Sequence, residues 1–340
     1  MHIYNVDSYP MINNLMPLVS IVTPSYNQGN FIEQTLLSVK GQDYQNIEHI
    51  IVDGGSNDQT LDILTGYKDQ YALRWISEKD RGQSDALNKG FRLAQGSIIG
   101  WLNSDDTYLQ GAVSSAVEFI SANNEINWVH GKGYWIDEQG TVVGEYPVKA
   151  YNLEDLLIFG MHMVQPSIFF KRSVLDLTGG LDVSIHSTMD FDFMLRVSRY
   201  FRGTFIPKFI ATRRIHKDAK SIAQANIFFR DYIRSLDKLF SDSDLPPKIV
   251  HLKKRAYHHA YLVGGYQAFQ DQDYKSARSL LKEALRYDPR PLSKDNIASI
   301  FLILESMIGA HWISPGISRK IEKSRFQSQH GRINVNWRSR

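Results

Sequence analysis

The sequence contains no cysteine, and it has no uncharged apolar run of about 18 residues, the length that a membrane-spanning helix needs. The first absence excludes disulfides and thiolate metal sites. The second argues against a spanning helix. Residues 1–16 lack the basic and apolar segments of a secretory signal, so we expect none there. A chain without cysteine suits a reducing compartment, and we expect a cytoplasmic protein.

A large excess of one charge is also missing, except at one end. The net charge is +3, but residues 317–340 hold seven Lys or Arg against the single acid Glu322, so the rest is weakly acidic. An acidic body argues against a nucleic-acid partner. The basic tail could contact anionic lipids at the inner face of a membrane, or it could be a solvated end.

Three apolar runs, by contrast, lead directly into polar loops. Residues 18–22, 49–52 and 97–102 are rich in Val and Ile, a pattern typical of buried parallel strands. In an open α/β sheet, ligands bind beyond the carboxyl ends of such strands. We therefore expect Asp53, Asp105 and Asp106, which follow two of these runs, to gather at one rim.

Helical patterns separate the strand-like runs. Segments with helical spacing occur at 30–39, 57–64 and 85–94, and a further strand is expected at 73–76. Such alternation predicts an α/β fold with a mostly parallel mixed sheet flanked by helices. The middle of the chain is less regular. We expect short strands at 128–131 and 133–136 with a turn between them, further strands at 140–143, 167–170 and 203–206, and helices at 153–159, from 172, and at 190–200.

After residue 221 the pattern is entirely helical. Residues 258–289 follow the spacing of one tetratricopeptide repeat, in which small residues let two antiparallel helices approach closely. The positions that fit are Tyr261, Gly265, Ala268, Tyr274, Ala277, Leu281, Ala284 and Pro289. We expect an N-terminal extension (1–17), an α/β domain (18–221), a helical region (222–316) containing this hairpin, and the basic tail (317–340).

The loops carry residue types with a clear chemistry. Asp53 could accept a hydrogen bond from a base N–H or a ribose hydroxyl, and the glycines beside it permit a tight turn. The adjacent carboxylates of Asp105 and Asp106 repel each other, which a cation or sugar hydroxyls would relieve. Mg²⁺ and Mn²⁺ prefer oxygen ligands and often complete their shell with substrate phosphates.

Taken together, the motifs resemble those of family-2 glycosyltransferases, which have the nucleotide-sugar-binding GT-A fold. The resemblance covers roughly residues 18–221. It rests on the sequences at 20–27, 53–60, 78–90, 100–106, 165–170, 179–182 and 190–196, which occur in the order of the family.

The resemblance implies a role for individual residues. It implies that Asp53 binds the base, that Asp105 lies near the ribose, and that Asp106 holds a divalent cation. Asp190 matches the general base, although Met189 stands where the family has a glutamate, which puts acceptor-side hydrogen bonding in doubt. The remaining positions implied to bind the nucleotide-sugar are Pro24, Ser25, Tyr26, Asn27 and Asp85, and His216 is implied to bind the diphosphate or metal.

The implied function is metal-assisted, inverting transfer of a sugar. The donor would be a nucleoside-diphosphate sugar, a UDP- or dTDP-sugar first of all, with Mn²⁺ or Mg²⁺ as cofactor. The acceptor would be a hydroxyl of a glycan or lipid-linked molecule, as in polysaccharide biosynthesis for a cell envelope. One alternative is a non-catalytic scaffold that binds partners through its C-terminal helices. A sugar nucleotidyltransferase is a third reading, but residues 24–30 lack its Gly-rich phosphate loop.

Overall fold

In the computed structural model, the described residues are 16–148, 152–216 and 225–288, together with 300, 302 and 303. The α/β part runs in the order β1 (Val19–Ser25), α1 (Ile32–Lys40), β2 (Ile47–Asp53), α2 (Thr60–Tyr67), β3 (Leu73–Ser77), α3 (Gln83–Leu93), β4 (Ile98–Trp101), β5 (Thr107–Tyr108), α4 (Ala112–Ser121), β6 (Ile126–Ile136) and β7 (Val142–Glu145). It continues with α5 (Leu153–Phe159), the 3-10 turn η1 (Gln165–Ser167), β8 (Phe169–Lys171), α6 (Val174–Thr178), α7 (Met189–Tyr200) and β9 (Arg202–Arg214). The later helices are α9 (Ala225–Phe240), α10 (Pro247–Val250), α11 (Lys253–Gln270) and α12 (Tyr274–Tyr287).

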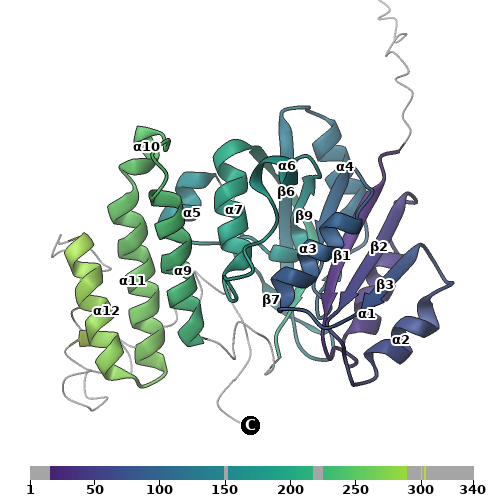
Figure 1. The fold of residues 1–340 in the computed structure, drawn as a ribbon, viewed down its shortest axis with the longest axis horizontal. Helices are drawn as coiled ribbons and strands as arrows, with labels where there is room; N and C mark the ends of the chain where they lie inside the picture. Colours follow the sequence, from purple (N-terminus) through teal and green to yellow (C-terminus); the bar gives the residue numbers. More distant parts are fainter. Residues whose placement is uncertain (1–15, 149–151, 217–224, 289–299, 301, 304–340) are drawn as a thin grey trace, which may run out of the picture.

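One mixed sheet of nine strands forms the centre of the α/β part (Figure 1). Its order is β3-β2-β1-β4-β8-β6-β9-β5, and β7 pairs with β6. The first four strands along the chain are parallel, as the alternating pattern predicted. The short β8 reverses direction between β4 and β6. The carboxyl ends of β1, β2 and β4 therefore share one edge, and the polar loops lie there.

Alternating side chains of the central strands feed two cores. Val22, Ile50 and Val52 are buried on the α3 side. Val19 and Ile21 point to the opposite side, with residues of α4 and β6. The near-continuous Val and Ile content of these strands follows from this double burial.

One sequence prediction was wrong. Instead of two strands with a turn near residue 132, β6 is a single strand from Ile126 to Ile136. It pairs in parallel with β9 along almost its whole length, with register shifts around Gly131 and Gly133. These glycines serve close packing, because a Cβ on Gly131 would lie 2.6 Å from Ile210 and one on Gly133 2.8 Å from the Ala211 oxygen. The predicted strand 203–206 is likewise only a part of the longer β9.

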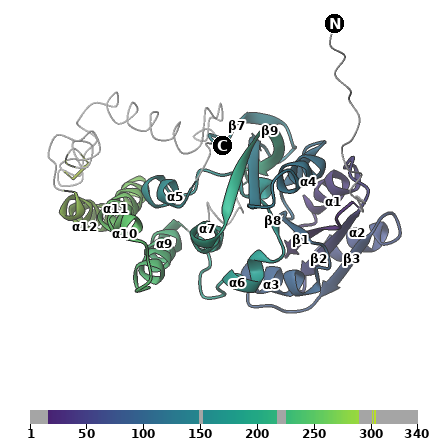
Figure 2. The same ribbon diagram turned by 90° about the horizontal axis from the view of Figure 1, so that it is seen from above.

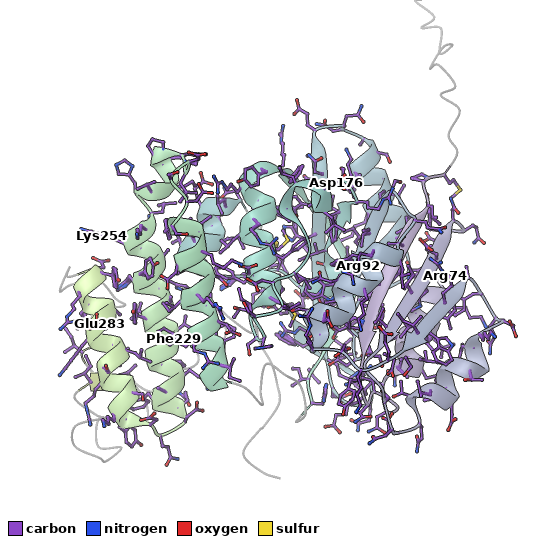
Figure 3. All side chains as sticks on the ribbon, in the orientation of Figure 1. Arg74, Arg92, Asp176, Phe229, Lys254 and Glu283 are labelled. Atoms are coloured by element: carbon purple, nitrogen blue, oxygen red, sulfur yellow. The ribbon has the colours of Figure 1, made fainter. Side chains whose placement is uncertain are left out.

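The later helices stand beside the sheet, with α7 between α9 and the strands in both views (Figures 1 and 2). Helices α11 and α12 form the expected hairpin. A Cβ on Gly265 would lie 2.7 Å from Leu281, which is why a small residue is needed there. Phe229 points from α9 toward α11 and packs on Tyr261 (Figure 3). Among the described residues, no helix is both long and apolar enough to cross a membrane.

Several predictions fall outside the described residues. These are most of the N-terminal extension, the boundary near residue 221, Pro289 of the hairpin, and the basic tail.

Candidate active site

The loop after β1 reaches the shared edge first. Pro24 and Ser25 end the strand, and the Ser25 Oγ is buried without a hydrogen-bond partner in the described part of the chain. Tyr26 is 59% exposed. Asn27 has a φ of 52°, a conformation that Asn tolerates better than most residues, and its N–H donates to Ser56 Oγ at 2.7 Å. The edge thus presents an exposed ring above a buried, unpaired hydroxyl.

Asp53, at the end of β2, lies inside its own loop. Its Oδ2 accepts hydrogen bonds from the N–H groups of Gly55 (3.0 Å) and Ser56 (2.8 Å) and from Ser77 Oγ (2.7 Å). Its Oδ1 accepts from Ser56 Oγ at 2.5 Å. The residue is fully buried. Its carboxylate shapes the loop, and its role in binding a base stays a prediction.

A second carboxylate lies over this loop. A Cβ added to Gly54 would meet Asp80 Oδ2 at 2.8 Å, and the Gly54 N–H donates to the Ser25 oxygen at 2.8 Å. Asp80 Oδ1 accepts from the N–H of Gly82 at 2.7 Å. The missing side chain at position 54 therefore leaves room for Asp80 at the shared edge. Sequence reasoning did not single out Asp80, although its place in the polar loop after β3, two residues before Gly82, was a usable signal.

Asp85 lies in the first turn of α3 and is nearly buried, with 9% exposure. It forms an ion pair with Arg81 at 3.1 Å and accepts from the Arg81 N–H at 3.2 Å. The hydrogen bond from the Arg81 side chain lowers the pKa of Asp85. This contact closes the loop before α3.

The acidic pair after β4 is electrostatically different. Asp106 is 2% exposed, and its Oδ1 accepts from the Arg214 N–H at 2.9 Å. Burial, and then the neighbouring charge of Asp105, raise the pKa of Asp106 to about 7. A carboxylate that ionises only near neutral pH gains from a nearby cation.

Asn103 connects this pair to three other elements. Its amide nitrogen donates to Asp106 Oδ2 at 3.2 Å and to Gln165 Oε1 at 2.8 Å. Its Oδ1 accepts from Gln83 at 2.8 Å and from the Trp101 ring at 2.9 Å. The side chains of Asn103 and Gln165 thus link the acidic pair to the neighbouring elements of the site.

His216 lies beside the pair, and its implied role toward the diphosphate or metal stays a prediction. Its Nε2 is 3.0 Å from Asp105 Oδ2, and its ring is 4.6 Å from that of Phe31. Its Nδ1 is buried and has no hydrogen-bond partner among the described residues. The neighbouring Arg214 side chain donates to the carbonyl oxygens of Asp105, Asp137 and Glu138 and to Gln34 Oε1.

Asp190 is the second residue of α7 and does not cap it, because the N-cap is Thr188. Its Oδ1 accepts from the Phe191 N–H at 2.8 Å. Met189 points inward, with its sulfur 3.2 Å from Ser84 Oγ in the first turn of α3. The departure at position 189 is therefore a core contact that ties the start of α7 to α3, next to the Gln83–Asn103–Asp106 network.

Arg213 was missed from the sequence. Burial lowers its pKa, but the charges of Tyr146, Asp106, Asp190 and Asp105 outweigh this and raise it. One guanidinium is thus in electrostatic range of the acidic pair and of the predicted base. The available signal was the strand pattern. Successive residues of a strand point to opposite faces of the sheet, so Arg213 and Arg214 must lie on different faces.

These residues fit an open site for a divalent cation, one that a bound substrate would complete. In the described part of the chain, no group of three or more His, Asp or Glu forms a closed metal cage. Mg²⁺ and related ions, however, often bind one or two carboxylates and take further oxygens from substrate phosphates. The buried, unpartnered His216 Nδ1 and the crowded carboxylates of Asp105 and Asp106 match such a site.

Comparison with known proteins identifies the family. The family described as Glycosyl transferase family 2 matches residues 20–175. Two uncharacterised glycosyltransferases of Mycobacterium tuberculosis, MT1564 and Rv1514c, are each 32% identical over 187 residues, covering 54% of this chain and 69% of theirs. The chain belongs to glycosyltransferase family 2. The Escherichia coli chondroitin synthase is 29% identical to this glycosyltransferase. The match covers 66% of the present chain but only 33% of the synthase.

Solved structures agree on the GT-A fold. The glycosyltransferase superposes on Staphylococcus aureus TarS residues 1–349 in complex with UDP-GlcNAc with a TM-score of 0.62, at 16% identity, covering 88% of this chain and 95% of that one. The mannosyltransferase PcManGT of Pyrobaculum calidifontis, in complex with GDP-Man and Mn²⁺, gives a TM-score of 0.58 at 18% identity, covering 88% of both chains. At such low sequence identities, the similarity shows a shared fold alone.

Proposed function

We propose that this glycosyltransferase inverts the anomeric centre as it moves a sugar from a nucleoside-diphosphate sugar to a hydroxyl of a glycan or lipid-linked acceptor. Asp190 is the general base, and Asp105, Asp106 and His216 face the diphosphate and its cation. The observation that carries the proposal is the meeting of three segments far apart in sequence. Met189, next to Asp190, contacts Ser84 at 3.2 Å, and the neighbouring Gln83 is joined through Asn103 to Asp106. Asp106 in turn accepts from the Arg214 N–H at 2.9 Å.

The donor side supports a nucleotide. The loop after β1 offers Tyr26 as an exposed ring for stacking, and the buried Ser25 Oγ beneath it has no hydrogen-bond partner among the described residues. Because Asp53 is engaged by its own loop, its part is to fix the shape of this pocket. The complexes of TarS with UDP-GlcNAc and of PcManGT with GDP-Man and Mn²⁺ make uridine and guanosine donors the first to test, along with dTDP-sugars.

The chemistry follows from the groups present. Transfer passes through an oxocarbenium-like transition state, and one base without a covalent intermediate inverts the anomeric carbon. Asp190 takes the proton of the acceptor hydroxyl as it attacks. Arg213 adds positive charge where the leaving diphosphate gains negative charge. A divalent cation, when bound, would neutralise part of that charge.

The test is a donor screen with the full-length protein and Mn²⁺, measuring release of nucleoside diphosphate. We expect Asp190→Asn to keep donor binding and to lose turnover by about 10³-fold, the usual scale for a general base. Asp106→Ala should weaken donor binding in Mn²⁺, seen by calorimetry. Asp176→Asn, an exposed carboxylate on α6, is the matched control and should behave as wild type.

Two results would oppose the proposal. Unchanged turnover by Asp190→Asn would remove Asp190 as the base. Failure of UDP-, dTDP- and GDP-sugars to bind under any metal condition would leave the scaffold alternative as the better account.

A further inference from the structure

The turn before the predicted base is held by a side chain from a distant helix, α9. Helix α7 begins at Met189 after the N-cap Thr188, whose side chain makes no capping hydrogen bond. The two N–H groups just before it, those of His186 and Ser187, donate instead to Asp231 Oδ2, each at 2.8 Å. Asp231 belongs to α9, 44 residues after Ser187. The C-terminal helices thus supply the support that a local cap usually gives.

Asp231 is 2% exposed, so its position needs an explanation. A buried carboxylate is costly unless hydrogen bonds compensate for lost water. Among the described residues, the two amides of this turn are the donors to its side chain. The charge is therefore committed to fixing the amides of His186 and Ser187, four and three residues before the base.

The same side of α9 makes further contacts with this segment. Arg234 donates to the Ser184 oxygen at 3.2 Å. Lys238 contacts Asp182 at 2.7 Å and Asp192 at 2.9 Å. Asp231, Arg234 and Lys238 are spaced three and four residues apart, which places them along one helical face. Figures 1 and 2 both show α9 directly beside α7.

Packing adds to the polar contacts. The Tyr232 ring stacks on that of Phe191 with centroids 4.3 Å apart, and Phe191 is the residue after the base. The segment around Asp190 is therefore held on both sides, by Asp231 before it and by Tyr232 and Lys238 after it.

We propose that Asp231 is a positioning residue for glycosyl transfer, which fixes the backbone turn that aims Asp190 at the acceptor. The inference rests on the proposed role of Asp190 and extends it, because it makes the C-terminal helical region part of the catalytic unit. A base acts only when its oxygen lies within hydrogen-bond reach of the hydroxyl. Donor binding uses other loops, so loss of Asp231 should affect turnover and leave donor affinity intact.

The experiment compares full-length Asp231→Ala, Asp231→Asn and Asp237→Asn in steady-state donor turnover, with UDP binding by calorimetry and a thermal melt. Asp237 is an exposed carboxylate on the same helix that accepts from Tyr257, so it controls for lost charge on α9. We expect Asp231→Ala to lower kcat by about 10²-fold, the scale of a misplaced reacting group, with donor KM within about twofold. Asp231→Asn keeps an acceptor oxygen and should recover most of kcat. Asp237→Asn should match wild type.

A wild-type kcat in folded Asp231→Ala would overturn the proposal, and so would a loss of donor binding that equals the loss of turnover. If Asp231→Ala does not fold, Arg234→Ala decides, because Arg234 is exposed and, within the described part of the chain, its loss removes the contact with Ser184 alone. We expect a severalfold lower kcat with unchanged KM, and an unchanged kcat would overturn the proposal. Asp190→Asn separates the two ideas, since full turnover by that variant would refute the base itself, whatever Asp231 does.

Discussion

The loops after β2 and β4 begin alike, but their buried aspartates have very different neighbours. Each follows a buried strand, and each carries an aspartate with almost no exposure, Asp53 or Asp106. Asp53 receives four hydrogen bonds from residues of its own and a neighbouring loop. Asp106 has a like charge beside it and a pKa raised to about 7 by burial and Asp105.

The difference teaches how one residue type serves two purposes at one edge of a sheet. A carboxylate whose two oxygens already accept from amides and hydroxyls of its own surroundings stabilises its loop, because those donors compensate for its burial. A carboxylate that is buried next to another acid is poised to bind a cation, because the charged form gains most from an opposite charge. Three predictions can break or sharpen this comparison.

The largest expected effect is on stability. Asp53→Ala leaves the N–H groups of Gly55 and Ser56 and two hydroxyls without their acceptor, and the Ser56 groups are buried, so it should lower the free energy of unfolding by about 2–3 kcal/mol. Asp106→Ala also frees a buried N–H, but it removes an unfavourable buried charge and should cost less than half as much. Urea denaturation at pH 8 with chelator measures both. Equal losses would mean that the two loops do not differ as described.

A second effect is on pH dependence. The pKa of Asp106 is about 7 in the folded protein and has its ordinary value near 4 in the unfolded chain, so the folded state binds the proton more tightly. Its contribution is complete below pH 4 and is lost as the pH rises to 7, by at most about 1.4 kcal/mol per pH unit. The stability of wild type minus that of Asp106→Asn should therefore fall between pH 5 and 7 in chelator. A flat difference would contradict the raised pKa.

The smallest effect concerns the shape of the β2 loop. An alanine methyl at Gly54 would meet Asp80 Oδ2 at 2.8 Å and displace it, so Gly54→Ala should weaken UDP binding about threefold, which is a few tenths to one kcal/mol. Gly66→Ala, where nothing lies within 4 Å, is the matched control. If the double variant Gly54→Ala/Asp80→Ala binds UDP as wild type does, the clash lies between the new methyl group and Asp80. Unaltered binding in Gly54→Ala would show that this loop does not shape the donor pocket.

Much of the fold could be predicted from the chain alone. The first three βα units follow from Val- and Ile-rich runs and from helical spacing, and their bounds differ from prediction by only a few residues. The strand β6 could not be read correctly, because Gly131 and Gly133 signal a turn and a close approach equally well. Only the partner strand β9 distinguishes the two.

The sequence by itself determined which loops carry polar groups, since a buried strand must be apolar and its side chains must become polar where it leaves the sheet. It also fixed the family through the order of its motifs. The tertiary structure alone decided which acids are satisfied and which are not, because hydrogen bonds to Asp53, the pairing of Asp106 with Asp105 and Arg214, and the grip of Asp231 on the turn before Asp190 join residues across the fold. Burial and partners set the state of a carboxylate, and neither is a property of local sequence.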